Sequence, residues 1–117
     1  MKLTLLGSCL DRHFSAIALP GEAPQVYADG FTNVIDIAFE DDGNLLVLEI
    51  AKNSLLSGDP TGALIRLKPN GSRKTLVSEG LTMPTAVVIG DDDALYISNC
   101  GACAGDGQVI RLELDEE

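Results

Sequence analysis

Two cysteines near the end of the chain have the spacing of a redox or metal-binding pair. Cys100 and Cys103 are separated by Gly101 and Ala102. In a thioredoxin-like site such a pair opens a helix, but here glycine-rich residues follow and then a strand-like run. We therefore expect either a loop-closing disulfide or two free thiols. Zinc would need two more ligands, which a second copy of the chain could supply.

A carboxylate and an amide provide the second group with possible chemistry. Glu49 and Asn99 each come at the end of an apolar run, and they are 50 residues apart. Oxygens of these side chains suit Ca²⁺ or another divalent cation, although two ligands per chain are few. The alternative is that they cap the ends of strands. No other cofactor is expected.

The composition excludes several classes of partner. The chain has 117 residues and a formal net charge of −10. It would repel a phosphate backbone or an anionic membrane surface, so we expect neither nucleic acid nor a membrane as partner. No apolar run approaches the ~20 residues that a membrane helix needs. Hydrophobic residues make up 45 % but aromatics only 4 %, which predicts an aliphatic core.

An internal repeat organises the sequence. Residues 30–48 align without a gap on residues 80–98, an offset of 50, and apolar positions match apolar positions. Gly62–Leu67 aligns with Gly107–Leu112 at an offset of 45, so the first copy has five additional residues within Ala51–Thr61. Upstream, the offset of 50 aligns Ile17, Gly21, Val26 and Tyr27 with Leu67, Gly71, Leu76 and Val77.

Each copy is predicted to be a set of short strands. The expected strands are Val34–Phe39, Leu45–Ile50, Ala63–Leu67 and Lys74–Val77, separated by turns rich in Asp, Asn and Gly. This spacing of turns indicates an all-β fold, and no segment has a helical period. Four strands in about 50 residues are typical of a β-propeller blade. A sandwich is the alternative, and the close repeat argues against it.

The chain is thus expected to be one domain, residues 1–117, with two to two and a half blades. We assign residues 1–13 to an irregular segment or partial strand, 14–29 to a partial blade, 30–79 to a full blade and 80–117 to another partial blade. The start of a blade's first strand and the end of its second lie at the same rim, which in propellers surrounds the central channel. Besides Glu49 and Asn99, this rim is predicted to carry Thr32, Asn33, Asp36, Thr82 and Thr85.

Several motifs, in order, resemble the C-terminal part of the ScyD/ScyE family. They are Gly30–Asp36, Leu48–Ala51, Leu55–Arg66 and Tyr96–Cys103, and the resemblance covers about Ala16 to Leu112. It implies a six-bladed propeller of the NHL and SMP-30 type. Acidic and amide side chains in the channel of SMP-30-type relatives hold a divalent cation. Family members are usually longer and exported, and Met1–His13 matches no signal peptide, so the compartment is left open.

Two blades of a propeller would leave two aliphatic faces open to water, and exposed patches of that kind usually mark interfaces. We therefore expect the chain to bind copies of itself in a closed ring, a trimer or a dimer. The leading hypothesis is a non-catalytic, self-assembling propeller fragment that serves as a scaffold or ligand-binding module. One alternative is a lactonase-like, metal-dependent hydrolase with its site in the channel. Another is a degenerate gene fragment without a function of its own.

Overall fold

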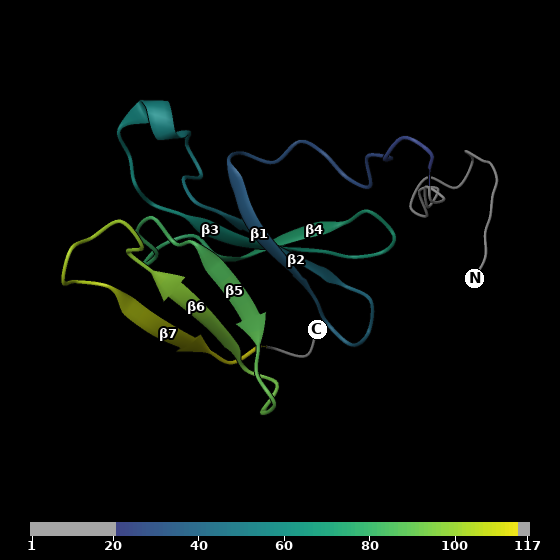
Figure 1. Ribbon diagram of the computed structural model, residues 1–117. Coiled ribbons are helices and arrows are strands. Elements are labelled where there is room, and N and C mark those ends of the chain that lie inside the picture. Colours follow the sequence, from purple (N-terminus) through teal and green to yellow (C-terminus); the bar gives the residue numbers. More distant parts are fainter. Residues whose placement is uncertain (1–20, 115–117) are drawn as a thin grey trace.

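The computed structural model describes residues 21–114, which form two antiparallel β-sheets (Figure 1). The first sheet has the order β1-β2-β3-β4, with bounds Val34–Phe39, Leu45–Glu49, Ala63–Leu67 and Arg73–Val77. The second has the order β5-β6-β7, with bounds Ala86–Ile89, Leu95–Asn99 and Gln108–Leu112. The predicted all-β class is confirmed.

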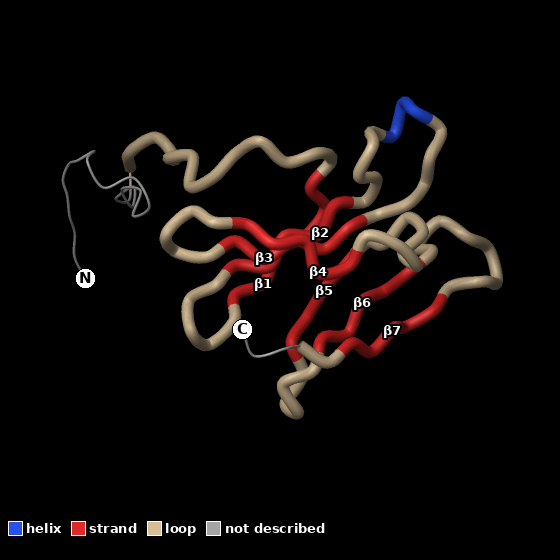
Figure 2. The backbone as a smooth tube through the Cα atoms, turned by 180° about the vertical axis from the view of Figure 1, so that it is seen from behind, coloured by secondary structure: helices blue, strands red, loops and turns tan. Residues whose placement is uncertain are grey.

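The only helical element of the described residues is the short 3₁₀ helix η1, Leu55–Ser57, in the loop between β2 and β3 (Figure 2). This part of the chain accordingly has no helix that is long and apolar enough to span a bilayer. Residues 1–13, and residues 14–20 of the expected partial blade, lie outside the described residues. The rest of that partial blade, residues 21–29, contains no strand.

Tight hairpins join the first two strands of each sheet, β1 to β2 and β5 to β6. In the first hairpin the Glu40 amide donates to the Asn44 carbonyl at 2.8 Å, and the Gly90 amide donates to the Ala94 carbonyl at 2.8 Å in the second. The carboxylate of Asp42 accepts from the Asn44 amide at 3.3 Å. Its repeat equivalent Asp92 accepts from the Ala94 amide at 3.1 Å. These acidic residues therefore stabilise turns through side-chain bonds to the backbone.

The repeat is also present in the backbone conformation. Left-handed φ angles are unfavourable for residues with a Cβ, so they mark special positions in a chain. Four pairs of residues that are 50 positions apart have a positive φ at both members. The pairs are Gly21 and Gly71, Gly30 and Gly80, Asn33 and Met83, and Gly43 and Asp93.

The two sheets pack face to face around an aliphatic core. Alternate residues of a strand point to opposite faces, so each sheet contributes one set of side chains. The fully enclosed members of this core are Leu46, Leu48, Leu64, Leu81, Val87, Leu95 and Ile97. Strands β1 and β5 lie side by side at the junction of the sheets. There the Val87 amide donates to the carboxylate of Asp36 at 2.8 Å.

Candidate functional site

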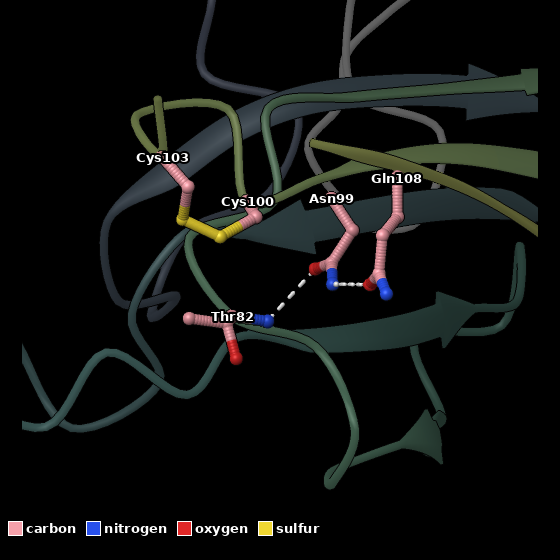
Figure 3. Close-up of a disulfide and its surroundings, with 5 residues drawn as sticks. All are labelled: Thr82, Asn99, Cys100, Cys103 and Gln108. Carbon is pink, nitrogen blue, oxygen red and sulfur yellow. Dashed lines mark hydrogen bonds between the residues drawn. A yellow bond between two sulfur atoms is a disulfide. The ribbon is translucent and has the colours of Figure 1, made fainter. Parts of the chain in front are cut away.

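The two side chains with cation-binding chemistry end the central strands of the two sheets. Glu49 is the last residue of β2 and Asn99 the last of β6, and both are buried. Glu49 Oε2 accepts a hydrogen bond from the Thr32 amide at 2.7 Å. Asn99 Oδ1 accepts one from the Thr82 amide, also at 2.7 Å (Figure 3). The repeat thus conserves a bond that ties the segment before each sheet's first strand to the end of its second.

These bonds bear on the predicted cation. Backbone N–H groups carry partial positive charge and point at the oxygens that a cation would need. The amide group of Asn99 is further engaged, because its Nδ2 donates to Gln108 Oε1 at 3.1 Å. Among residues 21–114, no group of three or more His, Cys, Asp and Glu side chains could hold a metal ion. The cation site stays a prediction.

The structure gives the other rim residues structural partners. Asp36 bridges the sheets: Oδ1 accepts from the Ile37 amide at 2.9 Å and Oδ2 from the Val87 amide. Asn33 Oδ1 accepts from the Leu55 amide at 2.9 Å, which fixes the start of η1. The hydroxyls of Thr85 and Ser98 lie 2.8 Å apart across β5 and β6. Each of these side chains therefore joins two segments of backbone or two strands.

Cys100 and Cys103 are joined by a disulfide directly after β6 (Figure 3). Their Cα atoms are 5.2 Å apart, within the usual range for a disulfide. The Cys100 amide donates to the Thr82 carbonyl at 2.7 Å, and the Cys103 amide donates to the Cys100 carbonyl at 3.0 Å. The disulfide therefore closes a small loop that is already anchored beside Asn99 and Thr82.

The largest feature that stays open is the face of each sheet turned away from the other sheet. On the first sheet, part of this face is covered by the chain before β1, through contacts among Leu45, Val47, Leu67, Ala28 and Phe31. Ile37 and Phe39 remain 51 % and 57 % exposed at its β1 edge. On the second sheet, Val88 is 57 % and Val109 75 % exposed. Both faces thus present aliphatic side chains to water.

The repeat relates these faces crosswise. The turned-away face of the first sheet corresponds to the face that the second sheet buries in the core. In order, Ile37, Phe39, Leu45, Val47, Ile65 and Leu67 correspond to Val87, Ile89, Leu95, Ile97, Ile110 and Leu112. The covering residue Phe31 fits this relation too, because its equivalent Leu81 is buried in the core.

The reverse relation holds for the other two faces. The face that the first sheet buries against the second has its equivalent on the turned-away face of the second sheet. In order, Ala38, Leu46, Leu48, Leu64 and Arg66 correspond to Val88, Tyr96, Ser98, Val109 and Arg111. The contact between the two sheets therefore joins two non-equivalent faces. The first sheet leaves open the equivalent of the face that the second sheet buries, and the second sheet leaves open the equivalent of the face that the first sheet buries.

Arg66 and Arg111 are equivalent in the repeat, but Arg66 lies on the face that is buried between the sheets and Arg111 on the open face of the second sheet. Arg66 makes a bidentate ion pair with Glu40, Nε to Oε1 at 2.8 Å and Nη2 to Oε2 at 2.9 Å, and its side chain is 3 % exposed. Arg111 pairs with Asp92 at 3.2 Å, and its side chain is 47 % exposed. In both sheets the arginine of the third strand thus holds a carboxylate from the turn between the first two strands.

A hydrogen-bonded cluster surrounds Arg111 on the open face. The Tyr96 hydroxyl donates to Asp92 Oδ2 at 2.7 Å and accepts from Arg111 Nε at 3.2 Å. This hydroxyl, the Ala94 amide and Arg111 together lower the pKa of Asp92. The pKa of Arg111 is raised, first by the Tyr96 hydroxyl and then by Glu113 and Asp92. Asp92, Tyr96, Arg111 and Glu113 thus bond to one another within the single chain, although they lie on an open face.

No family model, curated protein or solved structure matches this chain. The function proposed for the protein therefore depends on the geometry of residues 21–114.

The crosswise relation between the faces is the feature that sequence reasoning missed. Its signal was present in the sequence, because the repeat offset and the alternation of side chains along a strand together assign each strand residue to one of two faces. The equal separation of Thr32 from Glu49 and of Thr82 from Asn99 was a second signal, because it places both pairs at equivalent positions of the repeat.

Proposed function

We propose that the chain is a pair of neighbouring β-propeller blades that binds further copies of itself to close a ring. The ring serves as a non-catalytic scaffold or ligand-binding module. The observation that carries this proposal is the crosswise equivalence of the faces: each open face is the counterpart of a face that is already buried by a sheet of this same chain.

The contact between the sheets supplies the template for the contact between chains. Because it joins two different faces, its repetition is head-to-tail, and head-to-tail contacts give a closed ring when the rotation between units allows. Three chains of two sheets each would give the six blades of the propellers that the sequence resembles. Two chains with additional strands are the other arrangement that we expected.

Hydrophobic burial favours this assembly. Covering a fully exposed Val, Ile or Phe side chain contributes about 1.5–3 kcal/mol. Ile37, Phe39, Val88 and Val109 retain between half and three quarters of their exposure in the single chain. Ring closure would cover all four at once, and it would bury Tyr96 and Arg111 in the way that Leu46 and Arg66 are buried now.

Two matched variants test the head-to-tail geometry. Ile37→Asp places a charge on the open face of the first sheet, and Val88→Asp places one on the open face of the second. Each variant alone should be monomeric, because it keeps only one usable face. An equimolar mixture should form a heterodimer of twice the 12.3 kDa chain mass, since one intact face remains on each partner.

The control is Asn70→Asp, which adds the same charge in an exposed turn and keeps the oxygen that accepts from the Ser72 amide. This control should assemble like the unaltered chain in light scattering. If the two single variants keep the oligomeric mass of the unaltered chain, or if their mixture stays monomeric, the proposed contact is wrong. Circular dichroism must show the same strand signal in all samples.

A further inference from the structure

Among the described residues, the second sheet has three strands and the first has four. In the first sheet, β4 pairs with β3 through Ile65 and Thr75, and it forms the outer edge. Strand β7 is the repeat equivalent of β3 and forms the edge of the second sheet within the described residues. The outer side of β7 therefore presents backbone N–H and C=O groups that can accept another strand.

The repeat also identifies the counterpart of β4. At the offset of 50, Arg73–Val77 corresponds to residues 23–27, which precede the first sheet. These residues form no strand, and Val26 and Tyr27 are 72 % and 46 % exposed. Their equivalents Leu76 and Val77 pack against the core. Figures 1 and 2 show this segment on the far side of the first sheet from β7, so it does not cover the β7 edge of its own chain.

We propose that residues 23–27 of one copy add to β7 of the neighbouring copy as its fourth strand, a form of strand addition to an open sheet edge. This inference rests on the proposed ring and specifies how adjacent chains are joined. Following β3 and β4, Gln25 lies opposite Ile110 of the neighbour, as Thr75 lies opposite Ile65. Pro24 lacks an N–H and removes one donor, which is tolerated in an outer edge strand.

A second contact inside the chain, the bridge between Thr61 and Thr82, has a repeat equivalent that could form between neighbouring chains. Thr61 and Thr82 form an isolated antiparallel bridge between the loop before β3 and the segment before β5. Its two hydrogen bonds run from the Gly62 amide to the Leu81 carbonyl at 3.0 Å, and from the Met83 amide to the Pro60 carbonyl at 2.9 Å. The repeat equivalents of Thr61 and Thr82 are Asp106 and Thr32.

The backbone groups needed for this equivalent bridge are available. The Gly107 amide and the Phe31 carbonyl correspond to those of Gly62 and Leu81, and neither makes a backbone hydrogen bond with another described residue. A neighbouring chain whose residues 23–27 lie on β7 would bring its Phe31 and Thr32 to this loop. Residues 23–33 thus form one continuous docking segment that joins the end of one chain to the beginning of the next.

Engineered disulfides test this register. In a Cys9→Ser background, Gln25→Cys combined with Ile110→Cys should yield covalent oligomers on a non-reducing gel after mild oxidation. The equivalent pair Ile65→Cys and Thr75→Cys should close within one chain and stay at the monomer mass. The third pair, Gln25→Cys with Asp91→Cys, places the second thiol in an exposed turn and should give only background cross-linking.

The mass of the unoxidised protein in light scattering distinguishes a failure of the strand addition from a failure of the ring. Oligomers that cross-link at least tenfold more through Ile110→Cys than through Asp91→Cys support the added strand. Oligomers in which both pairs give the same low yield overturn the strand addition and leave the ring intact. A monomer at all concentrations overturns both.

Discussion

The bond between Glu49 and the Thr32 amide allows the capping role to be separated from a cation-binding role. Glu49 is 5 % exposed, and its Oε2 lies 2.7 Å from the amide nitrogen. Replacement by alanine leaves a partly buried N–H of Thr32 without its partner, which costs about 1–3 kcal/mol. Replacement by glutamine keeps an acceptor, as Asn99 does for Thr82 in the second sheet. A neutral bond in place of a charged one reduces stability by about 1 kcal/mol.

The order of stability predicted at pH 7 is therefore wild type, Glu49→Gln and Glu49→Ala, with the alanine variant about 1–3 kcal/mol below wild type. Urea unfolding followed by circular dichroism measures these differences. All three proteins must be compared at one concentration, because self-association contributes to apparent stability. An unchanged slope against urea would show that stability alone has changed.

Two results would refute this reasoning. If Glu49→Gln destabilises the fold as much as Glu49→Ala, the carboxylate charge itself is required and the capping role is insufficient. If millimolar calcium stabilises the wild type but not Glu49→Gln, the carboxylate binds the cation in the folded state. We expect calcium to leave the difference between the two proteins unchanged.

Three further perturbations have defined outcomes. Gly62→Val should destabilise the chain by about 1–3 kcal/mol in urea unfolding, because a Cβ there would lie 2.5 Å from Pro84 Cγ; no loss would contradict the packing. Asp36→Ala should accelerate hydrogen exchange of the Val87 amide, whereas Asp36→Asn should largely preserve its protection. Asp92→Asn should lower stability at pH 7, and the difference from wild type should vanish as the pH falls through the lowered pKa of Asp92; a gap that persists at low pH would contradict this.

The fold class and most strand positions could be predicted because they depend on short-range patterns. Short apolar runs bounded by turns rich in Asp, Asn and Gly predicted β1 and β3 with the observed bounds, Val34–Phe39 and Ala63–Leu67. Ile50 falls outside β2, and Arg73 joins β4, so the errors were single residues at strand ends. Strand ends depend on individual hydrogen bonds, which periodicity does not report.

The roles of the polar residues could be predicted only in part. Placing Thr32 near Glu49, and Thr82 near Asn99, follows from antiparallel strand geometry. That the Thr32 amide donates to Glu49, and the Thr82 amide to Asn99, depends on distances that the sequence does not contain. The bond from Asp36 to Val87 was not predicted either, because it joins two sheets whose relative placement depends on side-chain packing.

The mass of the unaltered chain in solution tests the central claim most directly. Light scattering over a range of protein concentrations should give a defined multiple of 12.3 kDa, with three chains as the arrangement that completes six blades. A mass of 12.3 kDa at all concentrations would contradict the account, because both open faces would then be stable in water.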